Sequence, residues 1–230
     1  DNSYEFLEDD RGHRDALLRK ELLAILTRYV DVVLVESETA RRRLDRLLQE
    51  RFPRVEVVPN GAKFSWRKVN EASQRICKEN RVLYVGRVDD PEKGVELLIQ
   101  AFCRVAPPNW TLRLVGQCDA RWRRDVLHKV GSVNAGRIMF TGYLTDRLAL
   151  LDEYLRARVF VLPSRREGFN LSILDAAITR CVVVATAVGG NSDVLENGRL
   201  GLLFEPGDQD RLTTILSEVM ANPGLFDEMA

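Results

Sequence analysis

The sequence predicts an α/β fold, a Rossmann-like, doubly wound parallel sheet with helices on both faces. From about residue 82 onward, short apolar runs alternate with longer amphipathic segments. Strands made almost entirely of apolar residues are typical of a parallel sheet that is buried on both faces. Such folds bind ligands at the carboxyl ends of their strands, where the strand order reverses. We therefore look for chemistry in the loops that lead from strands to helices.

The first part of the chain predicts two helices and two strands. Residues 14–28 place leucine and isoleucine on one helical face, and Ser37 is expected to cap a second helix over 37–49. Two apolar runs are too short for helices and are expected as strands, at residues 31–35 and 55–58. Pro59-Asn60-Gly61 stops the second strand. The polar, aperiodic residues 62–80 are expected to form a linker.

The later elements alternate regularly. Each expected strand is an aliphatic run, and each expected helix repeats apolar residues three and four positions apart. The strands are expected at residues 82–85, 112–115, 138–140, 159–162, 182–185 and 201–204. The helices are expected at residues 95–103, 121–130, 148–156, 171–178 and 211–220.

The composition excludes several classes of protein. Hydrophobic residues make up 45% of the 230 and charged residues 30%, as in globular domains, so disordered and collagenous chains are excluded. Lys plus Arg and Asp plus Glu both number 34, and the resulting zero net charge argues against a nucleic-acid partner. The longest uncharged stretch, 181–192, is too short to span a membrane, which takes about 20 apolar residues.

The cysteines and the chain start bear on localisation. Four cysteines without a C-x-x-C pair and only two histidines, His13 and His128, argue against a structural zinc site. With no basic and apolar leader at the start, we expect reduced cysteines and a cytoplasmic protein, cut from a longer chain. The arginines of residues 41–46 would allow docking at the cytosolic face of a membrane, but interleaved carboxylates favour a solvated helix face.

Two loops that follow strands hold the candidate site. In the first, residues 86–94, Gly86 allows a close turn, and Arg87 and Lys93 suit two adjoining phosphates. The alternative is a surface pair with the carboxylates of that loop. In the second, residues 163–175, Asn170 or Ser172 can cap a helix whose first amides would face an anion. The alternative there is an ordinary helix N-terminus.

Together these loops resemble the family-4, retaining, GT-B-fold glycosyltransferases. The resemblance covers roughly residues 30–225. The matching segments are Asn60-Gly61, Gly86-Arg87 with Lys93-Gly94, Phe140 to Leu144, Pro163-Ser164, Glu167 to Leu171, Gly189-Gly190 and Gly198 to Leu203. P-loop, G-x-G-x-x-G, G-x-S-x-G and H-E-x-x-H motifs are absent from the sequence.

The resemblance implies a role for each matching residue. Arg87 and Lys93 would hold the diphosphate of a nucleotide sugar, and Glu167 would bind hydroxyls of the transferred sugar. Asp175 would bind the ribose. The remaining donor-binding residues are Gly86, Phe169, Asn170 and Leu171 beside the sugar and phosphate, and Gly142, Tyr143 and Leu144 beside the base. The donor would be a UDP- or GDP-sugar, and neither metal nor other cofactor is expected.

The sequence departs from the family pattern at three positions. The family motif has two glutamates eight positions apart. Here the spacing is the same, but the second residue is an aspartate, Asp175, after Glu167. A shorter side chain implies a longer or water-mediated ribose contact. Asn170 replaces the commoner glycine, and Asn tolerates left-handed backbone well. Arg180 stands where the family usually has glycine, which implies either a different backbone path or a side chain that projects outward.

The resemblance also implies a division into domains. Residues 1–62 would be the end of an acceptor domain and its linker, and residues 63–230 the donor-binding domain. Since most of an acceptor domain is missing, we expect this chain to bind donor without transferring sugar. The acceptor would be lipid-linked, a glycan or a small molecule.

Two alternatives stay open. The chain could be a non-catalytic nucleotide-sugar-binding or scaffolding module of the same fold, which the departures at Asp175, Arg180 and Val182 favour, the last two standing where the family usually has Gly-x-Pro. A weaker alternative is another GT-B enzyme, such as a sugar-nucleotide epimerase or a phosphorylase. A sequon at Asn170 overlaps the donor loop, so a glycan there would contradict the donor reading.

Overall fold

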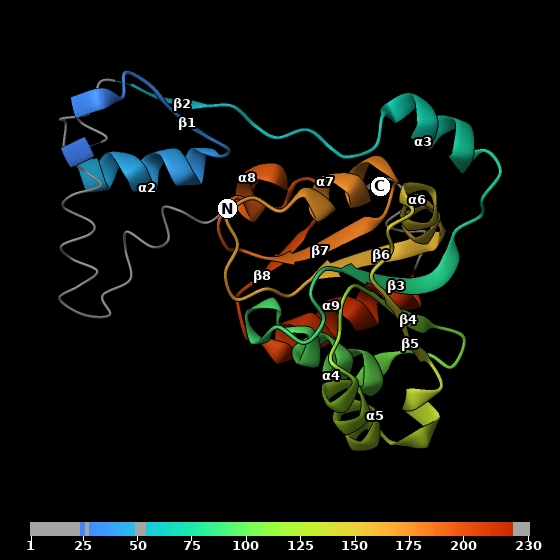
Figure 1. Ribbon diagram of the computed structural model, residues 1–230. Coiled ribbons are helices and arrows are strands. Elements are labelled where there is room, and N and C mark those ends of the chain that lie inside the picture. Colours follow the sequence, from blue (N-terminus) through green and yellow to red (C-terminus); the bar gives the residue numbers. More distant parts are fainter. Residues whose placement is uncertain (1–23, 26–27, 49–53, 223–230) are drawn as a thin grey trace.

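The protein is seen in a computed structural model that describes residues 24–25, 28–48 and 54–222, and these form two separate parallel sheets (Figure 1). The larger sheet has six strands in the order β5-β4-β3-β6-β7-β8. Its strands are β3 (Glu79–Val85), β4 (Thr111–Val115), β5 (Ile138–Gly142), β6 (Ala157–Leu162), β7 (Val182–Thr186) and β8 (Leu202–Phe204). The predicted doubly wound, Rossmann-like fold is confirmed.

Strand order reverses between β3 and β6. From β3 the chain adds β4 and then β5 on one side, and from β6 it adds β7 and then β8 on the other. All five strand pairs are parallel, so all six strands end at the same edge of the sheet. A crevice forms at the reversal because the connections on its two sides diverge to opposite faces.

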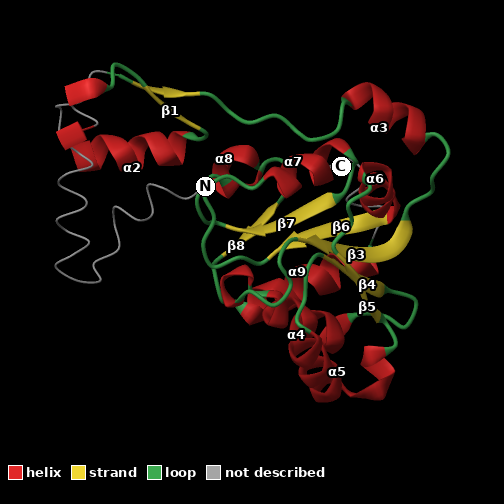
Figure 2. Ribbon diagram, viewed as in Figure 1, coloured by secondary structure: helices red, strands yellow, loops and turns green. Residues whose placement is uncertain are grey.

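Helices cover both faces of this sheet (Figure 2). One face carries α4 (Val95–Val105), α5 (Ala120–Ala135) and α9 (Gln209–Ala221), and the other carries α6 (Arg147–Arg156), α7 (Leu171–Ile178) and the short α8 (Asn191–Val194). The strands supply most of the core, and every residue of β7 is buried. Because helices cover both faces of the sheet, side chains on both sides of the strands are buried, and the strand sequences are largely apolar.

A small unit precedes the sheet. Strands β1 (Val33–Val35) and β2 (Val55–Val57) pair in parallel, and helix α2 (Glu38–Leu48) buries Ala40 and Leu44 against them. Ser37 Oγ accepts a hydrogen bond from the amide of Ala40 at 3.1 Å, which confirms Ser37 as the cap of this helix. The expected domain boundary at residues 62 and 63 stays a prediction.

Residues 62–80 are not the plain linker that their composition predicted. They contain helix α3 (Trp66–Ser73), capped by Ser65, and β3 begins at Glu79. Val69 is buried against Leu151 and Leu155 of α6. Phe64, Ala72 and Ile76 of the same stretch pack against this cluster. Apolar residues this sparse do not form a visible pattern in a polar stretch.

The other predicted elements are present with slightly different ends. Of the helix expected over 14–28, only residues 24–25 and 28 are described, and they are helical; the rest lies outside the described residues. Three short elements were not predicted: α8 and the 3₁₀ turns Pro91–Lys93 and Glu196–Gly198. Each has three or four residues, which is too few for a periodic pattern.

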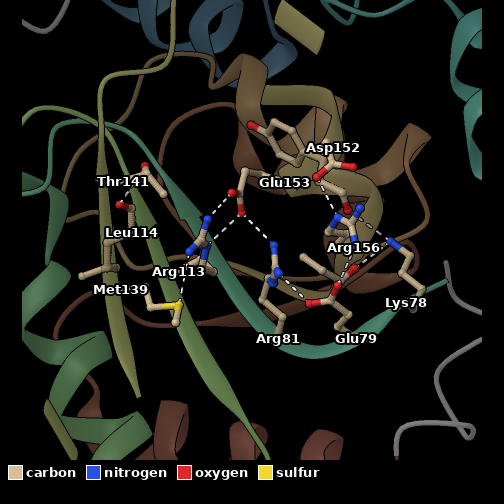
Figure 3. A network of polar contacts seen from close by, with 12 residues as sticks. Lys78, Glu79, Arg81, Arg113, Leu114, Met139, Thr141, Asp152, Glu153 and Arg156 are labelled. Carbon is tan, nitrogen blue, oxygen red and sulfur yellow. Dashed lines mark hydrogen bonds and ion pairs between the residues drawn. The ribbon is translucent and has the colours of Figure 1, made fainter. Parts of the chain in front are cut away.

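A network of ion pairs joins α6 to the sheet (Figure 3). Glu153 accepts from Arg81 Nη1 at 2.8 Å and from Arg113 Nε at 3.0 Å, and its side chain is 10% exposed. Arg81 also donates to Glu79, which pairs with Arg156 at 2.9 Å. Charges this deep remain stable only because each has a partner.

The turn after α7 holds a residue in left-handed conformation. Arg180 has a φ of 59° and is exposed. Of the two outcomes expected for an arginine in place of the family glycine, the side chain therefore projects outward, and the backbone keeps a glycine-like path.

We predict that Arg180→Gly stabilises the protein. A left-handed non-glycine residue costs about 1 kcal/mol, and glycine removes that strain. The midpoint of urea unfolding should rise. Arg180→Ala is the matched control, because it removes the same side chain but keeps the strain, and it should give no such rise. An equal rise in both variants would attribute the effect to the arginine side chain instead.

We predict that Glu153→Gln destabilises the protein by about 3 kcal/mol, since it leaves Arg113 without a counter-charge in a nearly buried layer and leaves Arg81 with Glu79 alone. Chemical denaturation measures this free energy. The neighbouring Asp152→Asn is the control. Its pair with Arg156 is 40% and 41% exposed, so the loss should stay below about 1 kcal/mol. Similar losses in the two variants would contradict the prediction.

Candidate functional site

Two loops meet above the point where the strand order reverses. The loop after β3 spans residues 86–94, and the loop after β6 spans residues 163–170. The amide of Arg165 donates to the carbonyl of Glu92 at 2.7 Å, which ties the two loops together through their backbones. The structure thus brings both sequence-predicted loops to the expected crevice.

The central contact of the site is an ion pair between these loops. Lys93 Nζ lies 2.8 Å from Glu167 Oε1, and the two side chains are 21% and 7% exposed. Ser164 Oγ donates to the same oxygen at 2.6 Å. The hydroxyl of Thr186 in β7 in turn donates to the carbonyl of Ser164 at 2.7 Å. Glu167 is therefore held in one position by neighbours on three segments.

Arg87 lies on the open side of the first loop. Its guanidinium pairs with Asp90 at 2.6 Å, and its side chain is 70% exposed. The buried hydroxyl of Tyr84 donates to the Arg87 carbonyl at 2.9 Å, and burial raises the pKa of this phenol, so it remains a donor. The backbone at Arg87 is fixed while its charged end stays accessible.

Glycine allows the strand-end loops to touch each other through their backbones. A Cβ on Gly189 would lie 1.8 Å from the carbonyl oxygen of Glu167, and Gly189 has a φ of 53°. A Cβ on Gly116 would lie 1.8 Å from the carbonyl oxygen of Gly86. A side chain at either position would push the loops apart.

Helix α7 begins at the candidate site. Asn170 Oδ1 accepts a hydrogen bond from the amide of Ser172 at 2.9 Å. Of the two N-cap candidates in the sequence, Asn170 and Ser172, Asn170 is therefore the cap. Asn170 has a φ of −98°, so it does not use the left-handed tolerance that the sequence suggested. The positive end of the helix dipole lies at residues 169–171, where it favours an anion.

Asp175 is enclosed within the fold. It is 0% exposed, and its Oδ1 accepts from the amide of Lys63 at 2.8 Å. Oδ2 has no hydrogen-bond partner among the described residues. Burial raises the pKa of this carboxyl, against the effect of the nearby amides of Lys63 and Phe64. The ribose contact implied by the family resemblance stays a prediction.

A cleft of about 340 Å³ lies at the ends of β3, β4 and β5. It contains four residues predicted as donor-binding: Gly86, Arg87, Tyr143 and Leu144. Its other lining residues are Lys63, Val85, Val115, Gly116, Gln117, Leu150 and Ser172. Tyr143 is 70% exposed, so its ring is accessible to a ligand.

Some predicted residues lie away from this cleft. Lys93, Glu167, Phe169 to Leu171 and Asp175 are not in its lining, and Gly142 lines a neighbouring hollow with Cys118 and Phe140. Sequence reasoning missed Lys63, Gln117 and Ser172 as cleft residues. Lys63 follows Asn60-Gly61, which is part of the family resemblance, and that proximity was the available signal.

No group of three or more His, Cys, Asp or Glu side chains is arranged to hold a metal ion within residues 24–25, 28–48 and 54–222. Among the helices of the described part, none has both the length and the apolar character to cross a bilayer. All four cysteines are free thiols.

The family model for the glycosyl transferases of group 1 matches residues 79–222, more than half of the chain. This chain belongs to that family.

Relatives and solved structures agree with this assignment. An exopolysaccharide phosphotransferase of Streptomyces coelicolor is 27% identical over 93% of this chain and 22% of its own. Glycogen synthase of Mycobacterium tuberculosis is 34% identical over 65% of this chain and 36% of its own. Sucrose-phosphate synthase of Thermosynechococcus elongatus superposes with a TM-score of 0.76 and 28% identity, over 96% of this chain and 57% of its own.

A second structure shares the fold at lower identity. Anabaena HepE, crystallised in complex with UDP, superposes with a TM-score of 0.74 and 20% identity, over 91% of this chain and 59% of its own. The chain thus spans well under half the length of the two sequence relatives and somewhat more than half of the two solved structures.

We predict that Gly189→Ala destabilises the protein by about 2 to 3 kcal/mol, because the new methyl group meets the Glu167 carbonyl. Thermal or urea unfolding measures the loss. Gly207→Ala is the matched control: Gly207 also has a positive φ, of 83°, in the turn from Glu205 to Asp208, but nothing lies within 4 Å of its Cβ position. Backbone strain alone should then cost about 1 kcal/mol. Equal losses would show that the contact with Glu167 is unimportant.

Proposed function

We propose that this chain is mainly the donor-binding half of a retaining glycosyltransferase, which takes a sugar from a nucleotide sugar and passes it to an acceptor. The observation that supports this most is the Lys93–Glu167 pair at 2.8 Å, between the two loops above the strand-order reversal; Arg87 of the first loop lines the 340 Å³ cleft. A cation and a carboxylate side by side suit a ligand in which a phosphate adjoins a polyol.

The cationic groups would bind the diphosphate. Arg87 has an exposed guanidinium at the cleft, and Lys93 lies on the same loop. The amides of residues 169–171 at the start of α7 add positive potential. A diphosphate leaving group gains charge as the sugar departs, so these groups stabilise the transition state more than the ground state. One such donor is often worth about 3 kcal/mol.

Glu167 would bind the hydroxyl groups of the sugar. Its position is fixed by Lys93 and Ser164, and hydrogen bonds from a polyol to a fixed carboxylate orient the anomeric carbon. Tyr143 and Leu144, with Gly142 beside them, would border the base. The complexes of Anabaena HepE with UDP and with UDP-glucose favour a UDP-sugar donor, with a GDP-sugar as the other candidate.

The reaction proposed needs no covalent enzyme intermediate. The bond between the anomeric carbon and the phosphate oxygen breaks, and the acceptor oxygen bonds to the same face of that carbon, with loss of its proton. We propose that no metal or cofactor takes part. The chain by itself is proposed to bind donor without transferring sugar, in the cytoplasm or at the cytosolic face of a membrane.

We predict that the chain binds one of UDP, GDP and ADP, and that Lys93→Ala and Arg87→Ala each weaken that binding roughly tenfold, about 1.4 kcal/mol. Calorimetric titration measures this. Glu167→Gln should weaken binding of the nucleotide sugar while leaving the nucleoside diphosphate nearly unchanged. Lys129→Ala, an exposed lysine on α5, is the control and should change nothing.

Two results would contradict the proposal. If binding is insensitive to Arg87, Lys93 and Glu167, the chain is a scaffold that has kept the fold without the donor site. If none of the three nucleotides binds, the donor-binding proposal fails for this chain as it stands.

A further inference from the structure

The linker residue Lys63 is held by both of its backbone polar groups. Its amide donates to Asp175 Oδ1 of α7 at 2.8 Å, and its carbonyl accepts from Arg147 of α6 at 3.4 Å. The next residue, Phe64, packs the edge of its ring against Tyr154, with ring centroids 6.1 Å apart. The backbone of the linker is therefore fixed to two helices of the large sheet at this point.

Lys63 also belongs to the lining of the cleft. Lys63 is exposed and lines the 340 Å³ cleft together with Arg87. The eleven lining residues include these two cations and no carboxylate side chain. A cleft with this balance of charge favours an anionic ligand.

Asp175 itself is not placed to touch such a ligand. It is 0% exposed and is absent from the cleft lining. A carboxylate that binds ribose must present an oxygen to it, but Oδ1 is taken by the Lys63 amide, and Oδ2 is buried without a hydrogen-bond partner among the described residues. A buried polar atom left unpaired is costly, so its retention needs a reason.

We propose that Asp175 is a positioning residue that fixes the linker at Lys63, and that the Lys63 ammonium joins Arg87 in binding the diphosphate of the nucleotide. This inference rests on the proposed function and deepens it. It adds Lys63 of the linker to the residues that bind the nucleotide sugar. It also replaces the expected contact between Asp175 and the ribose with an indirect role, in which Asp175 holds the linker in place.

Nucleotide binding tests the role of Lys63. Lys63→Ala should weaken binding of UDP about tenfold and leave binding of uridine, which has no phosphate, unchanged. Lys68→Ala, an exposed lysine on α3, is the matched control and should alter neither. A Lys63→Ala variant that binds UDP as tightly as the unchanged protein would overturn the proposal.

Ribose discrimination tests the role of Asp175. Asp175→Asn keeps an oxygen that can accept from the Lys63 amide, so it should retain UDP affinity within about threefold. The preference for UDP over 2′,3′-dideoxyuridine diphosphate should be unchanged in Asp175→Asn and in Asp175→Ala. If Asp175 touches the ribose directly, that preference disappears in Asp175→Ala and is reduced in Asp175→Asn, and the proposal is wrong.

Amide hydrogen exchange measures the tether without any nucleotide. Asp175→Ala should speed exchange of the Lys63 amide at least tenfold, and Asp175→Asn should keep it protected. Unchanged exchange in Asp175→Ala would overturn the positioning role. Failure of the proposed function appears separately, as absence of nucleotide binding by the unchanged protein, and the exchange result still decides whether Asp175 holds the linker. Where Asp175→Ala does not fold, Asp175→Asn and Lys63→Ala decide the question.

Discussion

The contact between the loops that follow β3 and β6 organises everything above the sheet. These loops leave neighbouring strands toward opposite faces, so the crevice between them would widen without a tie. The structure ties them through a backbone hydrogen bond from Arg165 to Glu92 and through the Lys93–Glu167 pair. The β7 loop can approach them only because Gly189 has no side chain. A crevice held in this way presents fixed charges to a ligand, which is the basis of electrostatic preorganisation.

Paired charges occur at two places around the large sheet. Between α6 and the strands, Glu153 is surrounded by Arg81 and Arg113, and the charges satisfy one another within the fold. At the crevice, Lys93 and Glu167 are 21% and 7% exposed, about as buried as Arg113 and Glu153 at 22% and 10%. The two groups of charges differ in place: one joins a helix to strands, and the other joins two loops at the strand ends, where folds of this kind bind ligands.

The fold could be predicted from the sequence because parallel strands buried on both faces leave continuous apolar runs. The two loops could be predicted because glycine and charged residues follow those runs directly. The structure of residues 62–80 could not be predicted, since α3 depends on the burial of Val69 against a helix far along the chain. The position of Lys63 could not be predicted for the same reason, because its amide donates to Asp175, 112 residues later. Contacts of that range leave no local pattern.

The linker is attached at Lys63 to the helices that cover the large sheet. The small N-terminal unit contacts α8 through a hydrogen bond from the Thr39 amide to Asp193 at 2.8 Å. Asp175 of α7 and Arg147 of α6 hold the amide and the carbonyl of Lys63. The chain therefore contacts the same layer of helices on both sides of the segment that leads from β2 to Lys63. The attachment leaves Asp175 Oδ2 buried without a hydrogen-bond partner among the described residues, so it has a cost in desolvation.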